Sequence, residues 1–264
     1  MILAQTLPLT VLLIFLECVV GGALLVLYTD VEGRVSPGFV ISSGAFLAVG
    51  AGIAFLLKFG YGNAAGAMGP FVAVLTLLLA GYVVLVVLKQ RALARLIGVA
   101  AVATGTVTLT QSATLQTNFS GNATLASVVL AAWVGGAAVT ALLLGHWYLV
   151  TPLLSPKSLT RVTEILLAGL LVQATFLVIE LATSGTAGTP FDRALAAVAS
   201  NSFVFWFRTL VGVVFPLVLG ALTWRACHLR AMQTATGFLY IVLGCVVAGD
   251  AAAKVFLFMT SISL

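Results

Sequence analysis

The sequence predicts an all-α polytopic membrane protein, with eight transmembrane helices in a bundle and both termini on the outer face. Three observations lead to this class. First, the chain of 264 residues is 62% hydrophobic and only 7% charged, with a mean hydropathy of +1.22, whereas a soluble domain carries about 25% charged residues. Second, its apolar runs are long enough to cross a bilayer as helices. Third, these runs lack the alternation of outer-membrane barrel strands. We therefore expect one transmembrane domain, residues 1–264.

Residues that favour turns separate the apolar runs. They include Gly33 to Gly38, Gly60 to Pro70 and Pro152 to Pro156. Pro216 is the exception, because it lies inside the seventh run, where we expect a kink. The first run lacks a preceding basic segment and exceeds the length of a signal-peptide core, so we interpret it as a crossing. No internal repeat is visible. The expected spans are 7–29, 38–58, 69–89, 93–115, 124–151, 158–184, 200–227 and 233–261.

The positive charges predict the orientation of these spans. Most Lys and Arg residues lie in the third, fifth and seventh connections, and the fourth and sixth hold only Arg193 beside Asp192. Cytoplasmic connections carry the excess of Lys and Arg, so the first group is expected in the cytoplasm. Both termini are then outside, an arrangement that needs an even number of crossings and so supports eight. We expect the inner (plasma) membrane of a bacterium and contact with its lipid bilayer.

Six ionisable side chains are placed by this topology in the outer half of the membrane. An ionised side chain at bilayer depth costs roughly 2.5–3.5 kcal/mol on insertion scales, so such groups are usually paired or functional. The set holds three acids and three bases. Asp250 precedes Lys254 by four residues, which places both on one helix face. The six candidate residues of a quinone or proton site are Glu17, Lys58, Glu180, Arg208, Asp250 and Lys254.

Two interpretations of these charges remain open. They could be ion pairs that only fix helix packing, or they could form a proton or ligand site around a common hydrated chamber beneath the outer surface. The second is favoured, because small residues such as Gly21-Gly22 and Gly135-Gly136 can supply packing without charges.

His146 and His228 pose a separate question, since a b-type haem needs two axial ligands at matching depth. Both lie near the expected cytoplasmic boundary, beside aromatic or basic residues, so interfacial anchoring is favoured over haem ligation. A proton relay through His146 is a further alternative. Cys18, Cys227 and Cys245 form no CxxC pair, so no metal site is expected.

Other motifs of self-contained chemistry are absent. The sequence has no Walker loop, GxSxG elbow or HExxH, and any redox chemistry would use a borrowed cofactor. The net charge of +5 comes from basic residues scattered along the membrane edges, which is not the stripe typical of nucleic-acid binding.

Four stretches, in order, resemble the membrane anchor of dimethyl sulfoxide reductase. The first is Leu7-Pro8-Leu9 followed by the run from Phe15 to Gly22. The others are Glu180-Leu181-Ala182-Thr183, Trp206-Phe207-Arg208, and Gly249-Asp250 with Lys254, Phe256 and Phe258. The chain is thus similar to the DmsC/NrfD type of anchor subunit. It departs from that pattern after the second span, where the family's His-Leu-Gly is replaced by Lys58-Phe59-Gly60.

The resemblance implies a respiratory subunit that binds quinol near the outer face and passes electrons to an iron-sulfur partner. In such a subunit Glu17 would lie by the quinone headgroup, and Glu180, Arg208, Asp250 and Lys254 would organise the pocket or conduct protons. Catalytic or cytochrome subunits are the other expected partners, and nucleic acid is not one. Two alternatives stay open: a non-catalytic assembly subunit of a respiratory complex, and a proton-coupled transporter.

Overall fold

The computed structural model describes residues 2–58, 68–114, 121–151, 155–183 and 202–260. Within these ranges, eight helical spans are long and apolar enough to cross a membrane, which confirms the predicted all-α class. Most of their boundaries lie within a few residues of the expected ones. The helices are α1 (Ile2–Glu32), α2 (Pro37–Lys58), α3 (Gly69–Val87), α4 (Arg91–Thr114), α5 (Gly121–Val150), α6 (Lys157–Thr183), α8 (Ser202–Thr209), η2 (Leu210–Val214), α9 (Phe215–His228) and α10 (Met232–Thr260).

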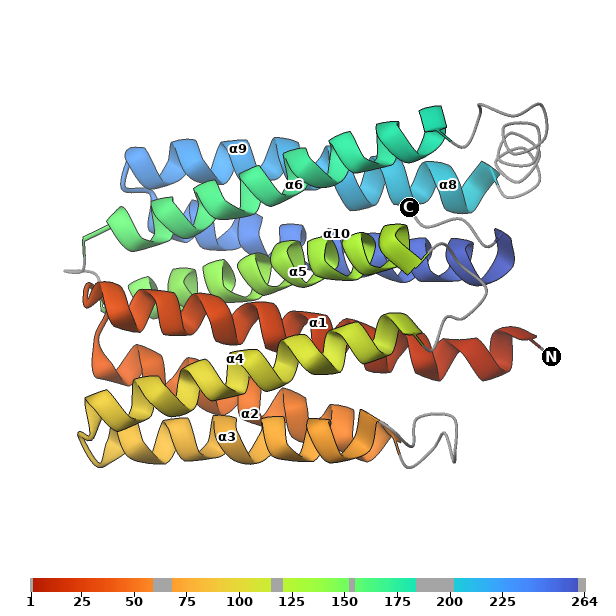
Figure 1. Cartoon of the computed structure of the whole chain (residues 1–264). Helices are drawn as coiled ribbons and strands as arrows, with labels where there is room; N and C mark the ends of the chain where they lie inside the picture. Colours follow the sequence, from red (N-terminus) through yellow and green to blue (C-terminus); the bar gives the residue numbers. More distant parts are fainter. Residues whose placement is uncertain (1, 59–67, 115–120, 152–154, 184–201, 261–264) are drawn as a thin grey trace.

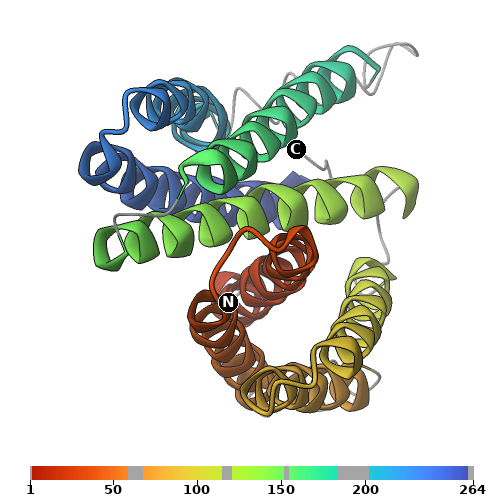
Figure 2. The same cartoon turned by 90° about the vertical axis from the view of Figure 1, so that its left-hand side faces the viewer.

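The helices form two four-helix bundles with the same connectivity. In the first, each of α1 to α4 packs on the next and α4 returns to α1. In the second, α5 packs on α6, α6 on α9 and α9 on α10, and α10 returns to α5. Figure 2, which views the molecule from one end, shows α1 to α4 on one side of α5 and the remaining helices on the other. This repeat of arrangement was not expected from the sequence.

The two bundles meet mainly where α1 crosses α5. Both helices carry Val-Gly-Gly-Ala near the middle, beginning at Val20 and at Val134. The backbones touch there: a Cβ atom added to Gly21 would lie 1.8 Å from the carbonyl oxygen of Ala132, and one added to Gly136 would lie 2.1 Å from the carbonyl carbon of Gly21. Close approach through small residues is the usual means of helix association in lipid.

The seventh span is continuous but changes its helical geometry before Pro216. Residues Leu210–Val214 form a π-helical turn, and the N–H of Phe215 donates to the carbonyl of Leu210, five residues back. Proline has no N–H to donate to the carbonyl four residues earlier, and a π turn is one way in which a helix accommodates that loss. A second close crossing lies in this turn: a Cβ atom on Gly249 of α10 would lie 2.1 Å from the Cα atom of Gly212.

The start of α1 and the end of α10 lie at one end of the molecule, and the turns between α1 and α2, α3 and α4, and α9 and α10 lie at the other (Figure 1). At that second end, buried Asp30 at the end of α1 binds Arg91 and Arg95 of α4; the Arg95 Nε atom lies 3.1 Å from Asp30 Oδ2. Glu32 binds Arg34 at 3.0 Å and Arg161 of α6 at 2.7 Å. These ion pairs therefore join α1 to helices of both bundles.

The crossing of η2 and α10 predicts a difference between two alanine variants of one helix. Gly249→Ala would force the backbones apart and should cost about 1–3 kcal/mol, the usual range for overpacking. Gly244→Ala is the matched control, because a Cβ atom there meets nothing within 4 Å, and it should be neutral or stabilise by up to about 1 kcal/mol. Thermal unfolding in detergent measures both. Equal melting temperatures for the two variants would contradict the close crossing.

Candidate functional site

Four of the six predicted charged side chains lie together between the bundles. Nζ of Lys254 on α10 donates to Glu17 Oε2 on α1 and to Asp250 Oδ2 on its own helix, both at 2.6 Å. Arg208 of α8 lines the same small cavity as Asp250 and Glu17. All four residues are buried, with exposures of 1% for Glu17, 2% for Arg208, 9% for Asp250 and 6% for Lys254. Two acids thus face two bases in a region of low dielectric constant.

Two glycine crossings lie next to these side chains in the helices that carry them. Glu17 precedes Gly21 by four residues, and Arg208 precedes Gly212 by four, so each charge shares a helix face with a glycine at a crossing. Asp250 directly follows Gly249. The crossings hold α1 close to α5 and η2 close to α10, and the contact of Lys254 with Glu17 then joins α10 to α1. The charges and the small residues therefore belong to one structural unit.

A small cavity lies against this cluster. It measures about 10 Å³, and its walls include Glu17, Arg208, Asp250 and Gln173 of α6. Within the described part of the chain, Glu17 Oε1, Arg208 Nε and Gln173 Oε1 are buried and have no hydrogen-bond partner. This volume is close to the roughly 10–15 Å³ that one water molecule needs, and such a water requires two to four polar partners. This cavity is much smaller than the hydrated chamber expected from the sequence, and it suits a single water.

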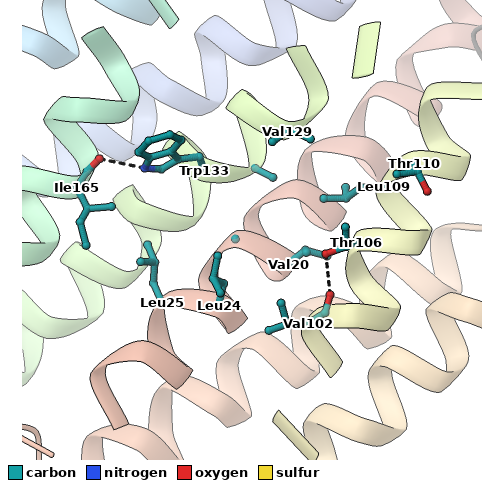
Figure 3. Close-up of a pocket in the computed structure, with 12 residues that line it drawn as sticks. Val20, Leu24, Leu25, Val102, Thr106, Leu109, Thr110, Val129, Trp133 and Ile165 are labelled. Atoms are coloured by element: carbon teal, nitrogen blue, oxygen red, sulfur yellow. Dashed lines mark hydrogen bonds between the residues drawn. The ribbon is translucent and has the colours of Figure 1, made fainter. Parts of the chain in front are cut away.

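Two larger apolar cavities flank α1. The first, of about 320 Å³, lies among α1, α4, α5 and α6 and carries no charged side chain. Figure 3 shows Leu24 and Leu25 of α1 on the side of Trp133 of α5, and Val20 beside Thr106 of α4. The indole N–H of Trp133 donates to the carbonyl of Ile165 at 3.1 Å. An apolar cavity with exposed walls among membrane helices suits a hydrocarbon chain.

The second apolar cavity adjoins the charge cluster. It also measures about 320 Å³ and lies among α1, α2, α5 and α10. Ile14, Cys18 and Val247 line both this cavity and the small polar one. Phe46 and Val49 of α2, which form part of its outer wall, are exposed. We call it the α1–α2 groove. A molecule that enters the groove from the lipid would thus be separated from the charge cluster by this shared wall.

The remaining predicted residues are not brought into the cluster. Lys58 is the last residue of α2 and Glu180 lies near the end of α6, but both side chains lie outside the described part of the structure. His146 is exposed on α5. His228 is exposed on α9, where its Nδ1 atom lies 2.9 Å from the carbonyl oxygen of Trp224.

Sequence reasoning missed two contributors. Gln173 lies within an apolar run of α6 and borders the small cavity; an uncharged amide inside a span was the available signal. Asp30 was not among the candidate residues, yet it is buried and binds two arginines. Its signal was the pair Arg91 and Arg95, which are four residues apart on the first turns of one helix.

No protein-family model matches the chain, and neither a curated protein nor a solved structure matches it significantly. Across the described residues, no three His, Cys, Asp or Glu side chains are grouped closely enough to hold a metal ion. The site is therefore interpreted from its own geometry.

Removing the shared cation should be more damaging than removing it together with one acid. Lys254→Met leaves Glu17 and Asp250 facing only Arg208, and breaking a buried pair in this way typically costs about 3–5 kcal/mol. The double variant Glu17→Gln/Lys254→Met leaves one acid and one base, so it should recover part of that loss. Unfolding in mixed micelles measures both. A double variant less stable than Lys254→Met alone would show that charge balance does not govern this cluster.

Proposed function

We propose that the chain is the membrane subunit of a quinone-linked respiratory oxidoreductase, in which the buried charges exchange protons with a quinol. The observation that carries this proposal is the wall shared by the α1–α2 groove and the charge cluster. A quinone has a polar ring and an apolar isoprenoid tail. An apolar groove beside a compact charged site therefore matches its chemistry better than it matches a hydrated solute.

The donor set fits the ring of such a molecule. Glu17 Oε1 can accept a hydrogen bond and Arg208 Nε can donate one, and neither has a partner among the described residues. A quinol offers hydroxyl donors, and a quinone offers carbonyl acceptors. The small cavity is too narrow for a ring. The ring would therefore lie in the groove. Its proton would pass to the cluster through the small cavity, which has room for about one water molecule.

Oxidation of a bound quinol releases two protons and two electrons, and the two protons would pass through Glu17 one after the other. Glu17 is suited to accept a proton, because one of its oxygens lacks a partner. Its other oxygen binds Lys254, which also binds Asp250, so three exchangeable groups follow one another from α1 to α10. Arg208 stays positively charged and limits the cost of a second negative charge at this depth. The electrons require a redox partner, for which the resemblance to DmsC/NrfD anchors suggests an iron-sulfur subunit.

One observation favours a second candidate, a non-catalytic assembly subunit. The four charges balance in sign and two of their contacts are as short as 2.6 Å, which is also the arrangement expected of ion pairs that fix helix orientation. Buried polar groups retained for structural specificity are known in some proteins. The two candidates differ in what a charge-neutral substitution should affect.

Narrowing the groove should reduce quinone binding. Val49→Trp adds bulk on a wall of the α1–α2 groove, whereas Leu56→Trp adds bulk at an exposed position of the same helix that does not line it. Quinone is extracted from protein purified in mild detergent and quantified per chain. We expect near-stoichiometric quinone in the wild type and in Leu56→Trp, and a severalfold loss in Val49→Trp. A quinone-free wild-type protein would remove the proposal.

Neutralising Glu17 should separate proton transfer from assembly. If Glu17 takes a proton from bound quinol, Glu17→Gln should slow quinol oxidation by the isolated complex by about 100-fold, the lower part of the range for general base catalysis. The complex should still assemble, because Asp250 continues to bind Lys254. Turnover is measured with an artificial electron acceptor, and assembly by the yield of co-purified subunits. Lost assembly with unchanged turnover per complex would instead support the structural subunit.

A further inference from the structure

A separate polar cavity lies at the end of the molecule opposite the termini. It measures about 320 Å³, within the lower part of the range of about 300–1,000 Å³ for small-ligand sites. It lies between the start of α6, the end of α9 and the turn after α1. Its charged and ionisable walls are Arg34, Lys157, Arg161, Glu164, His228 and Arg230. None of these residues belongs to the Glu17 cluster, so the inference does not depend on the proposed function.

Positive charge exceeds negative charge around this cavity. Glu32 neutralises part of the charge of Arg34 and Arg161, which it binds at 3.0 Å and 2.7 Å. Glu164 accepts the indole N–H of Trp224 at 3.0 Å. Lys157 and Arg230 form no ion pair with any carboxylate of the described residues. Around the cavity, four cations thus outnumber the two carboxylates of Glu32 and Glu164. The charges of Lys157 and Arg230 are free for a ligand.

We propose that this cavity binds a phosphate group. Arginine presents several N–H donors in a planar fork that matches phosphate oxygens, and lysine adds a compact charge. Arginines and a lysine from three separate segments can contact several oxygens of one tetrahedral anion at once. The cavity lies at the end that the distribution of Lys and Arg assigns to the cytoplasm. Basic pockets between helices at that boundary are suited to anionic lipid headgroups. A free phosphate would use the same donors.

The backbone of Arg230 offers a matched control. Arg230 follows α9 with φ of 55°, and Lys89 follows α3 with φ of 61°. The two turns share one pattern of hydrogen bonds: Arg230 N–H donates to the Cys227 carbonyl as Lys89 N–H donates to that of Val86. Both side chains are exposed at the same end of the molecule, but only Arg230 lines the cavity. A glutamine at either position removes one charge from equivalent backbone.

Native mass spectrometry of the full chain tests the lipid source. Wild type, Arg230→Gln, Lys157→Gln and Lys89→Gln are released from micelles with phosphatidylglycerol or, for comparison, zwitterionic phosphatidylcholine. We expect one phosphatidylglycerol to be retained by the wild type and by Lys89→Gln. Each of the other two variants should bind it roughly fivefold more weakly, as about 1 kcal/mol per basic residue near a lipid surface implies. Unchanged melting temperatures check that the variants fold.

A second arm tests free phosphate. The melting temperature of each variant is measured in inorganic phosphate and in chloride at equal ionic strength. Stabilisation by phosphate that Arg230→Gln and Lys157→Gln lose, without retention of phosphatidylglycerol, identifies a free phosphate as the ligand. Two results would overturn the site: neither phosphatidylglycerol nor phosphate acts on the wild type, or Lys89→Gln weakens binding as much as Arg230→Gln does.

Discussion

The ammonium group of Lys254, held by carboxylates of two helices, is the constraint on which the orientation of α1 against α10 depends. In low dielectric, removing one member of a buried pair leaves a charge with no comparable partner, so helix rotations that separate the charges are disfavoured. Contacts of 2.6 Å to both Glu17 and Asp250 require α1 and α10 to face each other at this depth. The glycine crossings act on neighbouring pairs, because they hold α1 close to α5 and η2 close to α10.

Charge is arranged differently in the interior and at the ends of the helices. Among the described side chains inside the membrane, the two acids and two bases of the Glu17 cluster balance and are almost fully buried. At the end opposite the termini, basic residues predominate, and Asp30 and Glu32 bind only some of them. Water and headgroups can solvate an unpaired cation at the boundary, but hydrocarbon cannot. The same physical rule therefore gives a closed ion cluster at depth and an open basic cavity at the surface.

Hydrophobic run lengths predicted the eight spans, because a bilayer of fixed thickness sets helix length directly. The i, i+4 spacing likewise predicted the pair of Asp250 and Lys254, since it depends only on helix geometry. The contact between Lys254 and Glu17 is of another kind: 237 positions separate them, and rotation of each helix about its axis is set by packing. For the same reason sequence reasoning overestimated the cavity and overlooked Gln173. The repeated arrangement of the two bundles is visible in the sequence through the Val-Gly-Gly-Ala segment that α1 and α5 share.

The size of the polar cavity bears on which kinds of substrate the cluster could serve. A hydrated solute would need an aqueous path and a chamber, whereas the space at Glu17, Arg208 and Gln173 suits about one water molecule. A proton needs no more than that, because it moves along hydrogen-bonded groups. Under the proposed function, the quinol that supplies the proton would come within one water of the cluster through the α1–α2 groove, which shares a wall with it. The two acids and two bases of the cluster balance, so each added proton leaves one positive charge without a counter-charge inside the membrane. Under the proposed function, release of that proton should therefore be coupled to the quinol oxidation that delivered it.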